Sequence, residues 1–477
     1  MSFNNILIAL SLSLVLGLVF RRQGRVYALA AVSVIALFWL QPSLNIGGYE
    51  IWLPSVVLGI VLLSWGLVSG PEERGRRENL VVGLALVALV AWLEFISRLE
   101  LVQAWFNPSP LLLWPAISLA LLILLTWGLF RVPRATSYGL WLMVVLLIFI
   151  FVLIKLPAFS EFFNWFLRKA SLHLPGPVVP IRPRFDLRWF GFSYIAFRLI
   201  HTLRDRQMGR MPQVSLAEYV TYVIFFPALA AGPIDRAERF VGELRQPLAL
   251  DSAGWLEAGQ RVMVGLFKKF VIADSLVTFA LSGANAGDIR TPGWMWIYLY
   301  AYTLLIYFDF SGYTDIAIGL GRLMGIKMPE NFNAPYLKSN LTQFWNNWHM
   351  TLTQWFRAYF FNPLTRFLRS NKSLPTWLII LLTQISTMVL IGLWHGITWN
   401  FVFWGLWHGL GLFLQNRWSE FTRPHAAEWL VLPWRQKTAE WVGVFVTFNF
   451  VALGWVFFVL PTTETAGQVF LKLFGFA

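Results

Sequence analysis

The chain contains no cysteine, and only 13% of its 477 residues are charged. The absence of cysteine excludes disulfides, thiolate metal sites and a covalent intermediate on a cysteine. A soluble globular protein carries about a quarter charged residues, so the scarcity of charge argues against a soluble domain. The charges lie in short clusters between long apolar runs, which is typical of a polytopic membrane protein.

Nucleic-acid-binding proteins are a second class that the sequence disfavours. The net charge is +14, but the basic residues flank apolar runs, where anchoring at the cytoplasmic side of a membrane accounts for them. The chain has no zinc-finger spacing, no aromatic RNA-binding signature and no separate basic domain. We therefore expect no nucleic-acid partner.

Hydrophobic residues make up 57% of the chain, and the mean hydropathy is +0.60. The first third holds six apolar runs near the length of about 20 residues that crosses a bilayer. These runs are 3–20, 26–44, 51–69, 80–97, 110–130 and 138–156. The first run lacks a preceding basic region, so we predict a retained span and not a signal peptide.

Basic residues alternate between the loops that join these runs. The loops after the first, third and fifth runs hold Arg21, Arg22 and Arg25, then Arg74, Arg76 and Arg77, then Arg131 and Arg134. The loops after the second and fourth runs hold almost none. This alternation predicts an outside N-terminus and basic loops in the cytoplasm.

The pattern changes after about residue 157, where apolar runs shorten and polar residues enter them. Prolines break the run at 225–240, and Asp309, Ser311, Tyr313 and Asp315 lie in the apolar stretch 307–325. Polar helices at membrane depth are tolerated when they are buried in protein or line a wet cavity. We predict scaffold helices over 1–157 and the functional core, including a last span at about 441–460, over 158–477.

Two further segments carry structural predictions. Residues 252–272 alternate apolar residues with Arg261, Lys268 and Lys269, which predicts an interfacial helix. Gly321 and Gly325 are spaced for close helix packing, and no β-α-β context makes them a nucleotide loop.

The segment "SNLTQFWNNWHMTLTQWFRAYFFNPL" (339–364) has apolar residues at helical spacing. We predict one helix, capped by Ser339 or Asn340 and limited by Pro363. Its other face would align Asn346, His349, Thr353 and Arg357 in one polar stripe. Two interpretations stay open at this point: a helix lying flat on the bilayer, or a helix that dips into a cavity.

The segment "GLWHGITWNFVFWGLWHG" (392–409) repeats a Leu-Trp-His-Gly frame around His395 and His408. "GITWN" interrupts it, with Gly396 as a stop and Thr398 or Asn400 as a cap. His395 should therefore end one helix near a turn, whereas His408 should lie midway along the next. We predict His395 as the reactive residue and His408 as a packed histidine that hydrogen-bonds between helices.

Four stretches together resemble the membrane-bound O-acyltransferase superfamily. They are "AAGPIDRAERF", "FDFSGYTDIAIGLGRLMGIKMPENFNAPYL", "FWNNWHMTLTQWFRAYFFNPL" and "GLWHGITWNFVFWGLWHG". The resemblance covers about residues 185–460, and the closest patterns are the bacterial alginate O-acetylase and D-alanyl-teichoic-acid branches. It implies an all-α polytopic fold, a ring of tilted helices with re-entrant or interfacial helices around a central passage.

The resemblance also implies the chemistry. It makes His395 the catalytic histidine, with His349 as the second histidine. We predict that the remaining site residues bind substrate: Asn346, Thr353, Arg357, Asp309 and Trp394. A neutral imidazole suits deprotonation of an attacking hydroxyl, so His395 would be the general base. His349, Asn346 or Arg357 would orient the donor or stabilise the oxyanion.

The expected enzyme lies in the cell membrane and moves an acyl group from a cytoplasmic thioester to a hydroxyl of an exported polysaccharide or cell-envelope glycan. Acetyl is the acyl group that we expect. We expect no metal and no tightly bound cofactor, since acetyl-CoA or an acyl carrier is the substrate. An extracytoplasmic transfer protein or a small carrier protein is an expected partner. D-alanyl transfer, a lipid-linked glycan flippase and a structural subunit that merely recruits a partner are the alternatives.

Overall fold

The computed structural model describes residues 2–19, 24–40, 49–96, 120, 124, 135–156, 158–159, 161–162, 191–248, 251–370, 372–429 and 431–476. Every regular element within these ranges is a helix, which confirms the predicted all-α class. The chain forms two compact units, Met1–Gln260 with Ala317–Met328, and Arg261–Ile316 with Pro329–Ala477. This division is one of compact contact units, whereas the boundary predicted at residue 157 separates scaffold helices from a functional core. The functional boundary stays a prediction.

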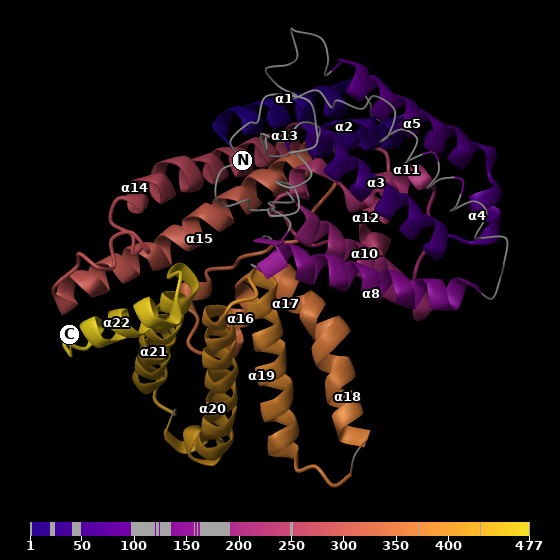
Figure 1. The fold of residues 1–477 in the computed structure, drawn as a ribbon. Helices are drawn as coiled ribbons and strands as arrows, with labels where there is room; N and C mark the ends of the chain where they lie inside the picture. Colours follow the sequence, from indigo (N-terminus) through magenta and orange to yellow (C-terminus); the bar gives the residue numbers. More distant parts are fainter. Residues whose placement is uncertain are drawn as a thin grey trace. The chain divides into compact units, whose positions relative to one another are not determined.

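The first unit contains most of the predicted N-terminal spans. Its helices are α1 (Phe3–Val19), α2 (Arg25–Trp39), α3 (Tyr49–Val68), α4 (Pro71–Gly75), α5 (Arg77–Ile96), α8 (Ala135–Lys155), α10 (Phe192–Gln207), α11 (Leu216–Val223), α12 (Ala237–Arg245) and most of α13 (Ser252–Leu266) (Figure 1). The runs predicted as spans one to four and six are therefore helices. Apart from residues 120 and 124, the run at 110–130 lies outside the described residues, as does the loop at Arg131–Arg134.

The second unit holds both Leu-Trp-His-Gly frames. Its helices are α14 (Asp274–Val277), most of α15 (Pro292–Leu323), α16 (Leu341–Asn347), α17 (Met350–Phe356), α18 (Asn362–Ser370), α19 (Thr376–His395), α20 (Trp399–Trp429), α21 (Pro433–Val459) and α22 (Thr463–Leu473). The helices α19 and α20 lie side by side (Figure 1).

Several helices have the length and composition of membrane spans. Among the described residues, Tyr138–Lys155, Thr376–His395 and Pro433–Val459 are long and apolar enough to cross a bilayer, and the last contains the predicted final span. Shorter apolar helices include Phe3–Val19, Arg25–Trp39 and Leu53–Val68. The chain is thus a multi-pass membrane protein, as its composition predicts.

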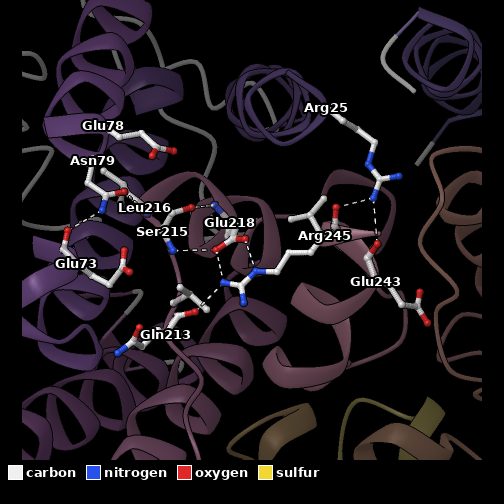
Figure 2. Close-up of polar contacts among 12 residues, drawn as sticks. Arg25, Glu73, Glu78, Asn79, Gln213, Ser215, Leu216, Glu218, Glu243 and Arg245 are labelled. Carbon is white, nitrogen blue, oxygen red and sulfur yellow. Dashed lines mark hydrogen bonds and ion pairs between the residues drawn. The ribbon is translucent and has the colours of Figure 1, made fainter. Parts of the chain in front are cut away.

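The basic start of α2 is held by the end of α12 in the first unit. The Arg25 guanidinium donates from Nη2 to the backbone oxygens of Glu243 (3.1 Å) and Leu244 (2.7 Å) (Figure 2). Next along the chain, Arg245 donates to Glu218 at the start of α11, at 2.7 and 2.9 Å. The charges at the ends of three helices therefore gather on one side of this unit.

The start of α5 joins the same group of polar contacts. Asn79 donates to the backbone oxygen of Glu73 (2.7 Å) and accepts from the backbone N–H of Leu216 (2.8 Å) (Figure 2). Tyr27 on α2 donates to Glu78 on α5 at 2.5 Å. The ends next to the first and third loops lie together, as the alternation of basic residues requires. That this side is cytoplasmic stays a prediction.

The end of α15 gives Gly325 a role besides close packing. Gly325 has φ +79°, and the N–H of Ile326 donates to the Gly321 oxygen at 2.9 Å. This is the six-residue closure of a helix that ends on a left-handed glycine. Gly325 therefore terminates α15, and a β-carbon there would lie 2.7 Å from the Arg25 guanidinium of α2, so the glycine also permits a close approach.

Candidate active site

The segment 339–364 does not form the predicted single helix. Asn340 caps α16 by accepting from the Gln343 N–H at 2.9 Å, as expected. The helix then breaks at Trp348 and His349, and α17 follows. Pro363 does not end the segment either, because the helix continues from α17 through the π-helical turn Arg357–Phe361 into α18.

The break turns His349 away from the predicted polar stripe. His349 has φ +42° and ψ 53°, a left-handed conformation that a residue with a β-carbon rarely adopts. Its side chain is 2% exposed, and its ring packs edge to face against Phe310, with centroids 4.7 Å apart. Helical periodicity assumed one continuous axis, and the left-handed residue reorients the second half of the segment.

The other three members of the stripe share one pocket. Asn346, Thr353 and Arg357 line a pocket of about 190 Å³, and the Arg357 guanidinium donates to the Asn346 oxygen. Most of the remaining lining is apolar, and α19 adds the polar side chains Gln384 and Thr387. Arg357 begins a π-helical turn, Arg357–Phe361, and such turns are frequent at functional sites. The three residues therefore lie together at one pocket, and the position of the segment relative to the bilayer stays a prediction.

The repeated frame ends and begins helices where the sequence predicts. The helix α19 ends at His395 with Gly396 at its C-cap, and α20 begins directly after Thr398. Asn400 does not cap α20; its amide donates instead to the Leu460 oxygen at 2.6 Å. His395 thus lies at a turn and His408 lies within α20.

The two histidines predicted as catalytic both contact Trp394. The Trp394 ring lies edge to face with His349 at 6.0 Å between centroids and with His395 at 4.5 Å. His395 is half-buried, and its ring also packs against Phe458 at 4.7 Å and Phe401 at 5.8 Å. The tertiary structure brings these three predicted site residues together, although 45 positions separate His349 from Trp394 in the sequence.

His408 corrects the prediction of a hydrogen-bonded bridge between helices. It is 0% exposed, and neither ring nitrogen has a hydrogen-bond partner among the described residues. Its neighbours are aromatic: Trp404 at 4.9 Å and Trp345 at 5.2 Å between centroids. The indole N–H groups of these two tryptophans are likewise buried and unpartnered in the described chain. Packing against rings, and not hydrogen bonding, holds His408.

Asp309 is placed in an ion pair. It pairs with Lys269, and further along α15 Asp315 pairs with Lys268 at 2.6 Å and with Arg261 at 2.6 Å. Three basic residues of the segment predicted to be interfacial therefore face carboxylates of α15. The pocket that Asn346, Thr353 and Arg357 line does not include Asp309.

Close approach of two backbones makes these ion pairs reachable. A β-carbon on Gly265 would lie 2.6 Å from the Gly312 oxygen, so only a residue without a side chain fits there. A π-helical turn, Phe267–Ala273, then carries both lysines toward α15. In the described part of the chain, no three His, Asp or Glu side chains gather as a metal site requires.

Sequence reasoning missed Asn331, which holds His349. Its Oδ1 lies 3.2 Å from Nδ1 of His349 and accepts from the N–H (3.1 Å) and hydroxyl (2.9 Å) of Thr351. Asn331 lies in the quoted motif "PENFNAPYL", but its contact spans 18 positions. No periodicity signals such a contact, because the segment around Asn331 has no helical repeat. Gln384 and Thr387 were missed because they look like ordinary polar residues in an apolar span.

Comparison with known proteins identifies the family to which these site residues belong. The sequence model of the MBOAT, membrane-bound O-acyltransferase family matches residues 106–457. The chain belongs to the membrane-bound O-acyltransferase family. The match includes His349, Trp394, His395 and the residues that line the pocket, and it confirms the resemblance seen in the sequence.

Individual members of the membrane-bound O-acyltransferase family match over part of their length. A probable alginate O-acetylase of Azotobacter vinelandii is 36% identical over 293 residues, 60% of this chain and 54% of that protein. A teichoic acid D-alanyltransferase of Streptococcus thermophilus is 30% identical over 315 residues, 62% of this chain and 75% of that protein. A peptidoglycan O-acetyltransferase of Helicobacter pylori is 35% identical over 264 residues, 54% of this chain and 46% of that protein. The chain thus spans about half the length of the two O-acetylating relatives.

Proposed function

We propose that this chain is an O-acyltransferase of the cytoplasmic membrane. It moves an acetyl group from a cytoplasmic thioester, acetyl-CoA or an acyl carrier, to a hydroxyl of an exported polysaccharide or cell-envelope glycan. The family match and the relatives named for alginate, teichoic acid and peptidoglycan support this class of reaction. The observation that carries the proposal is the convergence of His349 and His395 on Trp394.

His395 acts as the general base in this proposal. A neutral imidazole nitrogen takes the acceptor's hydroxyl proton while the oxygen attacks the thioester carbonyl and forms a tetrahedral intermediate. Collapse of the intermediate breaks the carbon–sulfur bond, and the sulfur leaves with the proton from the imidazolium. The position of His395 at the C-terminus of α19 suits a residue that becomes cationic, because the carbonyl groups there favour positive charge.

The pocket at Asn346, Thr353 and Arg357 is the proposed donor site. Its apolar walls suit an acyl group and the arm that carries it, and its polar side chains can hydrogen-bond a carbonyl oxygen. Arg357 is exposed and supplies a positive charge for an anionic part of the donor. Without cysteine in the chain, direct transfer from donor to acceptor is the simplest route.

Acetyl is favoured over D-alanyl by the charges of the pocket. A D-alanyl group carries an ammonium, which a nearby carboxylate would attract and a nearby guanidinium repels. The lining residues of the pocket include no Asp or Glu, and their one charged member is Arg357. D-alanyl transfer remains the second candidate because the D-alanyltransferase relative is matched over 75% of its length.

Purified protein in sealed vesicles tests the proposal. Labelled acetyl thioester and labelled D-alanyl carrier are supplied in turn on the side of the Arg25 loop, with a polysaccharide or its extracytoplasmic transfer partner on the other side. We expect base-labile label in the polymer from the acetyl donor alone. Label from the D-alanyl donor alone would select the second candidate. Movement of a lipid-linked glycan without transfer from any thioester would make the protein a flippase and end the proposal.

A further inference from the structure

The bonds around Asn331 show which atom its side chain turns toward His349. The Thr351 backbone N–H, which can only donate, points at one atom of the Asn331 amide at 3.1 Å, and the Thr351 hydroxyl lies 2.9 Å from the same atom. That atom must therefore be the oxygen, because an amide nitrogen there would set two donors against each other. His349 Nδ1 lies 3.2 Å from this same oxygen.

An oxygen acceptor fixes the tautomer of His349. Burial lowers the pKa of His349 to about 3, so the ring is neutral at neutral pH and carries one proton. An amide oxygen can only accept, so the nitrogen beside it must carry that proton. Nε2 is then left with its lone pair free of a proton.

Two features show that the arrangement is not the most stable one available. His349 occupies the left-handed region, which is unfavourable for a residue with a β-carbon. The Asn331 side chain is 0% exposed, yet its Nδ2 has no partner among the described residues, and an unsatisfied buried donor is destabilising. An aspartate would accept the same bonds without an orphaned N–H, but its charge would favour the imidazolium. Asparagine keeps the ring neutral.

We propose that Asn331 is a positioning residue, which holds His349 as the Nδ1–H tautomer so that Nε2 accepts a hydrogen bond from a substrate. The role rests on the proposed acyl transfer for its kinetic consequence, but the tautomer itself does not. Asn331 would act on the second histidine of the site as the carboxylate of a hydrolase triad acts on its histidine.

The first test is spectroscopic and needs no substrate. The protein is labelled with ¹⁵N-histidine in lipid, and the His349 signals are assigned by their loss in His349→Gln. We expect the unprotonated nitrogen of His349 to be Nε2, and Asn331→Leu to produce a mixture of tautomers. Asn340→Leu is the matched control, since it removes an asparagine cap from α16 without touching His349. Nε2–H in the wild type would overturn the inference.

The second test is kinetic and separates positioning from stability. We expect Asn331→Leu to lower kcat on the order of 10- to 100-fold with KM changed less than about threefold, short of the roughly 10⁴-fold loss seen when a triad loses its tautomer-fixing carboxylate. Asn340→Leu should keep kcat within about threefold. Asn331→Asp should recover much of kcat and move the acid limb of the pH–rate profile to higher pH, because the carboxylate favours protonation of the ring.

A double mutant shows whether Asn331 acts through His349. If it does, His349→Ala with Asn331→Leu is no slower than His349→Ala alone, because the positioned group is already absent. Additive losses, or equal losses in Asn331→Leu and Asn340→Leu, would contradict the inference. A wild-type protein that transfers no acyl group at all defeats the proposed function instead, and the ¹⁵N experiment still decides the tautomer.

Discussion

The two Leu-Trp-His-Gly frames are identical in sequence and opposite in structure. In the first, the helix stops: His395 is the last residue of α19 and is half-buried. In the second, the helix continues, and His408 is 0% exposed among rings of α16, α20 and α21. The side chain that reaches a turn is available for chemistry, and the one inside the helix is enclosed by packing.

The glycine that follows each histidine has a different conformation in the two frames. Gly396 is extended and ends α19. Gly409 stays helical, and a β-carbon there would lie 2.8 Å from the Ile385 α-carbon, so it lets α20 approach α19 closely. The same tetrapeptide therefore terminates one helix and packs another. The residues that follow it, and not the frame itself, decide which outcome occurs.

The largest contrast between the two frames should be in catalysis. We expect His395→Ala to reduce acyl transfer by on the order of 10²–10⁴, the usual contribution of a general base. Its thermal unfolding temperature should stay near that of the wild type, because the ring is half-buried at a turn. Labelled acyl transfer per mole of folded protein measures this, with His395→Gln as a control of similar size. A folded His395→Ala protein that keeps most of its activity would show that His395 is not the general base.

His349 extends the comparison to a histidine that is buried like His408 but held by Asn331. We expect His349→Ala to lower kcat about 10- to 100-fold, less than His395→Ala, because it orients a reacting group and does not take the proton from the acceptor. Single-turnover assays with saturating donor compare the two variants. A loss equal to that of His395→Ala would give both histidines the same chemical role.

The packing around His408 can be tested from the opposite helix. A β-carbon on Gly454 of α21 would lie 2.7 Å from His408 Nε2, so Gly454→Ala should destabilise the protein by about 1–3 kcal/mol. In a His408→Ala background the added methyl enters the space that the imidazole leaves, and most of that loss should disappear. Thermal unfolding in detergent is measured for the two single variants and the double variant. The difference between the double variant and the sum of the single variants gives the coupling free energy between positions 408 and 454. Additive shifts would mean that the two positions do not share the space.

The smallest effect should come from replacing His408 by a residue of similar size. His408→Leu removes two unpartnered ring nitrogens from a buried site and leaves little void, so we expect stability within about 1 kcal/mol of the wild type. Activity per folded molecule should be retained. His408→Ala, which does leave a void, should be less stable than His408→Leu by roughly 1–3 kcal/mol. A well-folded His408→Leu protein without activity would show that this frame also carries chemistry.

Local signals in the sequence predict much of the fold. The lengths of the apolar runs anticipate α1, α2, α3, α5 and α8, and Asn340 anticipates the start of α16. Gly396 anticipates the end of α19. These features depend on hydrophobic burial and on hydrogen bonds within a few residues. Local patterns suffice for them because the interactions themselves are local.

The candidate site was only partly predictable, because its contacts are long-range. The place of Thr353 and Arg357 in one pocket follows from helical spacing, since α17 and the turn after it keep them on one face. Asn346 reaches the same pocket from α16, on the other side of the break. His349 departs from that face through one left-handed residue. Its partner Asn331 and the ion pair of Asp309 with Lys269 join segments that are 18 and 40 positions apart.

By itself, the sequence determined that this is an all-helical membrane protein with a helix break after His395, because hydropathy and helix-ending residues act locally. Only the tertiary structure decided which polar side chains find partners. It gave His349 an oxygen acceptor, left His408 enclosed by rings and set both catalytic candidates against Trp394. Such pairings depend on where distant helices meet. The sequence pattern of one segment does not identify the residues of another segment that will contact it.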